Sequence, residues 1–231
     1  MRFHLSPFLC IALSAGPAAA AERSFTITGF DRIRVDGPFR VKLATGVAPF
    51  ARATGSSTAL NGVSVEVQGQ TLVIRKSPSG WGGYPGETPG PVEISVGTHD
   101  LTTAWLNGAG SLSIDKAKAQ AFDLSVQGAG SVEIGRLTAD RLRLGLAGSG
   151  SAAVAGTVAD VRAIVRGTSS FDGSALNSKD AMIGAEGTTE VKLSATGTAK
   201  VDAQGLATIE LGGRPACTLR VHGSAVVSGC R

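Results

Sequence analysis

The fold is decided by a repeat in the second half of the chain, where AFDLSVQGAGSVEIGRLTAD (residues 121–140) is followed by RLRLGLAGSGSAAVAGTVAD (residues 141–160). The two segments align without a gap, so that Leu124 falls on Leu144 and Ile134 on Val154. Apolar and polar residues alternate on both sides of a glycine-rich triplet, which is the period of a half-buried strand and not of a helix. The repeat therefore predicts short strands joined at glycine corners.

Two or three short strands and one tight corner in about 20 residues are the content of one β-solenoid coil. A sandwich or barrel of hairpins gives the same alternation, but its turns need not recur at a fixed interval. We therefore expect an all-β fold, a single-stranded β-helix-like solenoid whose stacked coils bury inward ladders of Leu, Val and Ile. The expected structural corners are Gly108, Gly110, Gly128, Gly130, Gly148 and Gly150.

Residues 25–75 also alternate, but they show neither the fixed period nor an evident glycine corner. We interpret them as an N-terminal sheet that caps the first coil, because an open solenoid end exposes unpaired strand edges. The expected organisation is one domain over residues 22–231. It comprises an N-terminal sheet or cap at residues 22–100, with a Pro/Gly-rich loop at 77–91, and repeat coils at 101–231.

The first 21 residues, MRFHLSPFLCIALSAGPAAAA, combine a basic start, an apolar stretch and a run of small residues. This pattern is typical of a signal peptide and predicts export. Its removal leaves Cys217 and Cys230, which are expected to form a disulfide in an oxidising compartment. Two free thiols or a metal-binding pair are the alternatives. No apolar stretch after the predicted cleavage site is long enough for a transmembrane helix.

Composition limits the function further. The chain contains 32 glycines, 17% charged and 5% aromatic residues, and its net charge of +4 is too small and too scattered to indicate nucleic-acid binding. His99 and His222 stand far apart, without a second ligand at metal spacing, so neither a metal site nor a cofactor is expected. Asp140 and Asp160 align one period apart, and the repeat itself explains that coincidence without catalysis. We expect no enzymatic activity.

The loop SPSGWGGYPGETPGP (residues 77–91) carries Trp81 and the only tyrosine, Tyr84. Exposed rings of this kind suit stacking on sugars or anchoring a partner, so these two residues are the candidate ligand-binding residues. The alternative is that the loop folds back as a local lid over the solenoid end. Trp105 either belongs to the cap or extends the same patch.

Three segments carry a resemblance to a known family: FTITGFDRIRVDGPFRVKLATG (25–46), TLVIRKSP (71–78) and PVEISVGTHDLTTAWLNGAGSLSI (91–114), together with the recurring GAGS and GSGS motifs. Over roughly residues 25–227 the chain resembles the exported bacterial family of unknown function called the putative auto-transporter adhesin head GIN domain. Family members typically have an aspartate after the glycine corner, where this chain has Ser111, Ser131 or Ser151. The resemblance implies a β-solenoid at the cell envelope.

The sequence thus predicts a non-enzymatic envelope protein, in the periplasm or at the cell surface of a bacterium, whose solenoid is a scaffold for interaction or adhesion. The expected partner is an unknown envelope component or a glycan, and the sequence leaves the oligomeric state open. The alternative is a glycan-binding or polysaccharide-degrading solenoid. A third hypothesis is that the chain is an accessory protein of an envelope stress or signalling system.

Overall fold

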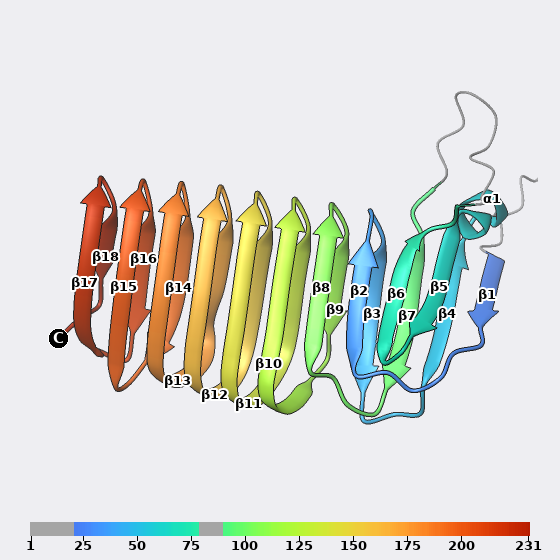
Figure 1. The fold of residues 1–231 in the computed structure, drawn as a ribbon, viewed down its shortest axis with the longest axis horizontal. Coiled ribbons are helices and arrows are strands. Elements are labelled where there is room, and N and C mark those ends of the chain that lie inside the picture. The colour runs from blue at the N-terminus through green and yellow to red at the C-terminus, as the bar shows by residue number, and fades with distance from the viewer. Residues whose placement is uncertain (1–20, 79–89) are drawn as a thin grey trace, which may run out of the picture.

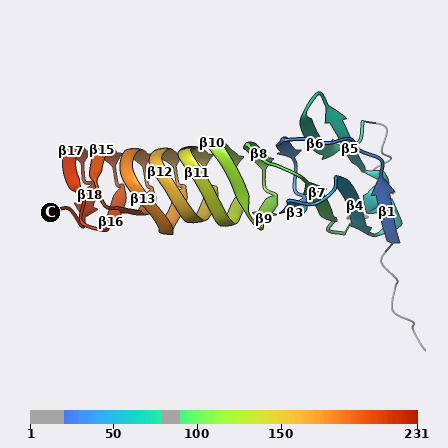
Figure 2. The same ribbon diagram turned by 90° about the horizontal axis from the view of Figure 1, so that it is seen from below.

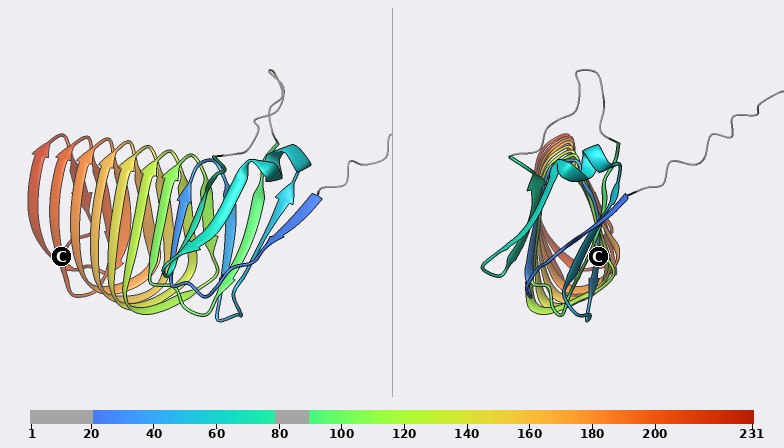
Figure 3. Two further views of the ribbon diagram at one scale, coloured as in Figure 1. Left: turned by 45° about the vertical axis from the view of Figure 1, so that its right-hand side comes forward. Right: turned by 90° about the vertical axis from the view of Figure 1, so that its right-hand side faces the viewer.

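The computed structural model describes residues 21–78 and 90–231, which form one elongated β-solenoid (Figure 1). The strands of these residues join in a single 18-stranded sheet that winds around a flattened core. A view along the stack shows the sheet as two facing layers closed by arcs (Figure 3). The all-β solenoid predicted from the repeat is thereby confirmed.

The N-terminal part consists of short strands and one helical turn. Its elements are β1 (Ala21–Phe25), β2 (Arg32–Asp36), β3 (Arg40–Thr45), β4 (Phe50–Gly55), α1 (Ser57–Asn61), β5 (Val63–Gln68), β6 (Thr71–Lys76) and β7 (Glu93–Thr98).

The stacked coils that follow contain strands only. They are β8 (Thr103–Gly108), β9 (Ser111–Ile114), β10 (Ala117–Gly128), β11 (Ser131–Gly148), β12 (Ser151–Gly167), β13 (Ser170–Gly187), β14 (Glu190–Ala195), β15 (Thr198–Gly205), β16 (Thr208–Gly212), β17 (Ala216–Gly223) and β18 (Val226–Ser228).

Each coil climbs one layer, turns at a glycine corner, descends the other layer and returns through a lower arc. We call the layer whose strands end at the corner the front face, which carries β2, β8, β15 and β17 toward the viewer of Figure 1, and the other the back face. Coils pair in parallel, with Leu124 opposite Leu144 and Ser131 opposite Ser151, a spacing of 20 residues. Side chains that point inward at equivalent positions therefore stack into buried ladders.

The corner depends on glycine because the backbone turns there with positive φ and lies directly against the preceding corner. Gly148 has φ +110°, and a Cβ added to it would lie 2.7 Å from the carbonyl oxygen of Gly128. The Ser149 N–H donates to that same oxygen at 2.9 Å. The contact that leaves no space for a side chain thus belongs to the hydrogen-bonded ladder joining the coils.

Residues 32–45 form a coil of their own, although the sequence showed no clear corner there. β2 pairs in parallel with both β6 and β8, and β3 with both β7 and β9 (Figure 1). Gly37, with φ +131°, stacks under Gly108 at the corner. The corner escaped the sequence comparison because Phe39 stands where the later copies have a second glycine.

Antiparallel strands close the stack at the N-terminal end. β1 pairs antiparallel with β4, β4 with β7, and β5 with β6. The hairpin of β5 and β6 leans away from the front face. Figure 2 shows this from below, and Figure 3 shows it along the stack. A change from parallel to antiparallel pairing ends the coil repeat, so no further coil of the same kind can stack there.

The coils narrow toward the C-terminus. One inward ladder of the front face runs through smaller and smaller side chains, from Phe122 through Leu142 and Val161 to Ala181 and Ala199. The last of these steps is also the shortest coil, because Ala199 follows Ala181 by 18 residues, whereas Leu142 follows Phe122 by 20. A shorter coil encloses less volume, so close packing requires smaller inward side chains.

We predict that Gly148→Ala destabilises the protein by about 1–3 kcal/mol, because alanine resists positive φ and its methyl group would meet the Gly128 carbonyl. The matched control is Gly145→Ala on the same strand, where an added Cβ meets nothing within 4 Å. That change should be neutral or stabilising by up to about 1 kcal/mol. Urea unfolding followed by circular dichroism measures both values, and equal effects would contradict the assignment of the corner.

Candidate functional site

A groove of 850 Å³ runs along the lower arcs of the coils formed by β10 to β13. Its floor and walls are ladders of equivalent positions, set side by side by the parallel register. The floor consists of Ala119, Ala139, Val158 and Ser178; one wall of Lys118, Thr138, Thr157 and Asn177; and the other of Gln120, Asp140, Ala159 and Lys179.

The groove has a mostly apolar floor between mostly polar walls. Ala139 and Val158 are buried with exposed fractions of 9% and 1%, while the wall residues Thr138, Thr157 and Asn177 are exposed. At a strand spacing of about 4.8 Å, the four rows span about 14 Å along the solenoid axis. A lysine stands on each wall at opposite ends, Lys118 and Lys179. This arrangement suits an extended chain that lies over the floor and hydrogen-bonds to the exposed walls.

Hydrogen bonds fix the C-terminal end of the groove. Ser178 Oγ donates to the Ser194 carbonyl at 2.7 Å, and the Gly197 N–H donates to the Lys179 carbonyl at 2.8 Å. The Asp180 carboxylate accepts hydrogen bonds from the Thr198 N–H at 2.9 Å and from the Thr198 hydroxyl at 2.6 Å. These two bonds hold the pKa of Asp180 below its ordinary value. The carboxylate thus joins two coils where the coil shortens.

The structure separates the two aspartates that the repeat had aligned. Irregular pairing after Ile134 shifts the register by one residue, so that Asp160 lies opposite Arg141 and not opposite Asp140. Asp140 lines the groove, whereas Asp160 faces the front with Asp180 as its neighbour in the next coil. The expected alignment of Asp140 with Asp160 was therefore wrong, because a bulge in the lower arc removes one residue from the period.

A second recess lies on the front face where the hairpin of β5 and β6 leans outward. It has a volume of 630 Å³ and is lined by Trp105 together with polar side chains from β2, β5, β6, β8 and β10. Arg34 is the register partner of Trp105, and its Nε donates to Asp36 Oδ2 at 2.8 Å. Asn107 Nδ2 donates to Asp36 Oδ1 at 2.6 Å. An indole ring thus lies beside a connected set of planar polar groups.

Sequence reasoning named Trp105 but missed its partners. Arg34 and Asp36 lie about 70 residues before Trp105 and Asn107, and only the insertion of β2 beside β8 brings them together. The available signal was the match of VDG at residues 35–37 to LNG at 106–108. That match places Arg34, the residue before Val35, opposite Trp105. It does so only when residues 32–45 are recognised as a coil.

The other sequence candidates do not assemble into a site. Trp81 and Tyr84 lie outside the described residues, so their binding role stays a prediction. His99 follows β7, where its carbonyl accepts a hydrogen bond from the Gly46 N–H at 2.9 Å, while His222 lies on β17 at the far end of the stack. Across residues 21–78 and 90–231, no three His, Cys, Asp or Glu side chains gather as metal ligands would.

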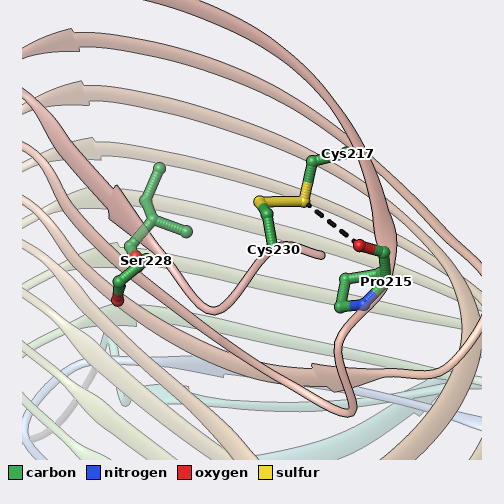
Figure 4. Close-up of a disulfide and its surroundings, with 5 residues drawn as sticks. Pro215, Cys217, Ser228 and Cys230 are labelled. Atoms are coloured by element: carbon green, nitrogen blue, oxygen red, sulfur yellow. Dashed lines mark hydrogen bonds between the residues drawn. A yellow bond between two sulfur atoms is a disulfide. The ribbon is translucent and has the colours of Figure 1, made fainter.

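Cys217 and Cys230 form the predicted disulfide, with Cα atoms 5.7 Å apart (Figure 4). The bond fastens the segment after β18 to the start of β17. Beside it, the Arg231 N–H donates a hydrogen bond to the Pro215 carbonyl at 3.3 Å. Cys217 continues the inward ladder of Ala199. In the described part of the chain, no helix has the length and apolar character to cross a membrane.

The narrow core, repeated coils and surface recesses define a β-solenoid scaffold that presents extended ladders of side chains. The sequence profile of the family described as "Putative auto-transporter adhesin, head GIN domain" matches residues 29–215. The chain therefore belongs to this family, as its motifs had indicated. No curated protein sequence matches it.

Solved structures share the fold over nearly the whole chain. A putative adhesin from Bacteroides fragilis superposes with a TM-score of 0.76 at 16% identity, covering 90% of this chain and 95% of its own. A putative lipid binding protein from Parabacteroides distasonis gives 0.71 at 22% identity, covering 92% and 97%. A putative adhesin from Parabacteroides merdae gives 0.71 at 14%, covering 92% and 96%. At these identities the likeness concerns the fold alone.

We predict that Asp180→Asn flattens the loss of stability on acidification. A carboxyl whose pKa is lowered in the folded state stabilises the fold above its unfolded pKa of about 4, and this contribution disappears as the pH falls through the folded value. The variant should therefore have a lower Tm than the wild type at neutral pH, with the gap closing in acid. Asp202→Asn, an exposed neighbour on the same face, is the control, and a constant gap for Asp180→Asn would refute the role given to this carboxylate.

Proposed function

We propose that this chain is a non-enzymatic adhesion-type scaffold, exported to the periplasm or the cell surface, which binds a partner along the groove of the lower arcs. The observation that carries the proposal is the groove itself. Four coils repeat the same three positions, so the floor of Ala139 and Val158 and the rims beside it form a straight track. A regular track fits an extended partner and needs no convergent reactive groups.

The family of the chain, its structural neighbours and its disulfide support this proposal. The family and two of the solved structures carry descriptions as adhesins. The disulfide between Cys217 and Cys230 is of the kind that persists in oxidising compartments. These observations favour export and binding over an intracellular reaction.

Preorganisation is the physical reason for using a solenoid in this way. The groove walls project from strands that are hydrogen-bonded on both sides, so binding does not have to order them. Each row adds one copy of the same small contact. Affinity therefore accumulates along the axis and is lost when a bulky group interrupts the track.

A substitution that fills the groove tests the proposal. Ala159 stands on one wall and is exposed, and Ala153 lies six residues earlier on the same strand, exposed on the back face. We expect Ala159→Trp to weaken saturable binding of the mature chain to isolated cell envelopes by about tenfold or more, and Ala153→Trp to leave it unchanged. Envelope binding that is the same for both folded variants, or absent from the wild type, would overturn the groove assignment.

A second candidate function, glycan binding, is favoured by the recess at Trp105. An indole face beside an Asp36 carboxylate, an Asn107 amide and an Arg34 guanidinium offers a stacking surface and directional hydrogen bonds, which suit a sugar ring. The predicted loop residues Trp81 and Tyr84 are the other place at which a glycan would bind. We propose the recess as the main contact.

Tryptophan fluorescence separates these two glycan sites. The mature chain is titrated with peptidoglycan fragments and envelope polysaccharides, and we expect a saturable change that Trp105→Ala abolishes and Trp81→Ala retains. Loss in the Trp81→Ala variant alone would move the site to the loop. No change with any of these glycans in the folded wild type would refute glycan binding.

A further inference from the structure

The two ends of the solenoid are finished differently. Antiparallel β1, β4 and β5 and the short helix α1 close the N-terminal end, whereas β17 and β18 are the last strands of the two faces (Figure 1). β17 pairs only with β15, and β18 only with β16, among the described residues. The outer edges of both strands are therefore free in this part of the chain.

The free edge of β17 presents backbone hydrogen-bonding groups. The Ala216 N–H points inward to the stack, where it donates to the Gly197 carbonyl at 2.9 Å. Successive residues of a strand direct their N–H and C=O groups to opposite edges, so those of Leu219 and Val221 face outward. An unpaired edge of this kind is a template for one more strand.

The apolar core also ends abruptly at this coil. Leu219 and Val221 continue the inward ladders of Val201 and Ala203, but their exposed fractions are 44% and 41%, against 3% and 0% one coil earlier. On β18 the inward residue is Val227, which is only partly buried although its partner one coil earlier, Ile209, is fully buried. A further strand laid on β17 would cover Leu219 and Val221 as each coil covers the one before it.

The charge of the last coil indicates what kind of strand it accepts. Beyond Glu210 the sequence contains Arg214, Arg220 and Arg231 and no aspartate or glutamate. A second copy docked end to end through the same coil would bring these like charges together. An acidic segment would instead be attracted to them, because opposite charges across an interface favour encounter and like charges suppress it.

The disulfide makes this edge a preformed template. It ties Cys230 back to Cys217 at the start of β17, so the terminal coil is held in place before any partner arrives. The entropy of ordering the receiving strand is then already lost in the free protein. A partner strand has to order only itself.

We propose that the outer edge of β17 and β18 binds an extended segment of a partner polypeptide, with alternating apolar and acidic residues, by strand addition. The apolar side chains of that segment cover Leu219 and Val221, and its acidic side chains face Arg220. This inference goes beyond the proposed groove function and does not depend on it, since the groove lies on the arcs of β10 to β13.

The test uses a labelled peptide of alternating valine and glutamate, with an alternating valine and lysine peptide as its counterpart, and fluorescence anisotropy with the disulfide-bonded mature chain. We expect saturable binding of the glutamate peptide and at least about tenfold weaker binding in Val221→Pro, which removes an outward N–H. Val221→Ala keeps that N–H and loses only part of the covered apolar surface, so it should weaken binding less than Val221→Pro does. Arg220→Glu should reverse the preference between the two peptides.

Several outcomes would overturn the proposal. Equal binding of both peptides would show that charge does not select the partner, and no binding of either would remove the site. Concentration-dependent dimers of the wild type in sedimentation equilibrium, dispersed by Val221→Pro, would assign the edge to a second copy of this chain. Circular dichroism and an intact disulfide verify that each variant is folded, and Ala159→Trp should bind the glutamate peptide normally, which separates this test from that of the groove.

Discussion

The hydrogen-bond register between neighbouring coils is the constraint on which the rest of the structure depends. Each strand inside the stack pairs with the coils on both sides, so every coil must follow nearly the same backbone path. At the corner this path requires positive φ and direct contact between backbones, which Gly148 over Gly128 provides. Variation is confined to places that leave the register intact. The lower arc is such a place, and bulges there let the spacing fall from 20 to 18 residues while the inward ladder shrinks from Phe122 to Ala199.

The same register creates the surfaces that we assign to binding. Because equivalent residues stand side by side, the chain can lay out a track such as Thr138, Thr157 and Asn177, but it does not draw unlike groups toward one point. Within the regular coils unlike groups meet as single pairs on one ladder, such as Asp123 with Arg143, and a larger set meets where the repeat is interrupted. The recess at Trp105 forms at such a place, because an early coil is inserted beside a later one and the hairpin of β5 and β6 leans aside.

The two ends of the solenoid show how a repeat is terminated. Antiparallel strands at the N-terminal end break the symmetry and occupy the edges of the parallel coils. At the C-terminal end the ladder continues to the last described coil, where Leu219 is exposed although Val201 is buried. The disulfide fixes this coil, but it supplies neither apolar cover nor hydrogen-bond partners for the edge of β17. The disulfide thus holds the terminal coil in place, while the outward backbone groups of β17 keep no hydrogen-bond partner among the described residues.

The sequence by itself determined the strand period, the glycine corners and the solenoid class, because each depends on local pattern. It also predicted the bond between Cys217 and Cys230, which the structure shows. The tertiary structure alone decided the place of residues 32–45 inside the stack, the separation of Asp140 from Asp160 and the meeting of Arg34 with Trp105. Register shifts of a single residue and pairing between distant strands are set by packing across the whole coil. A periodic pattern does not place them, since it fits equally well one coil away and does not show where a bulge changes the pairing.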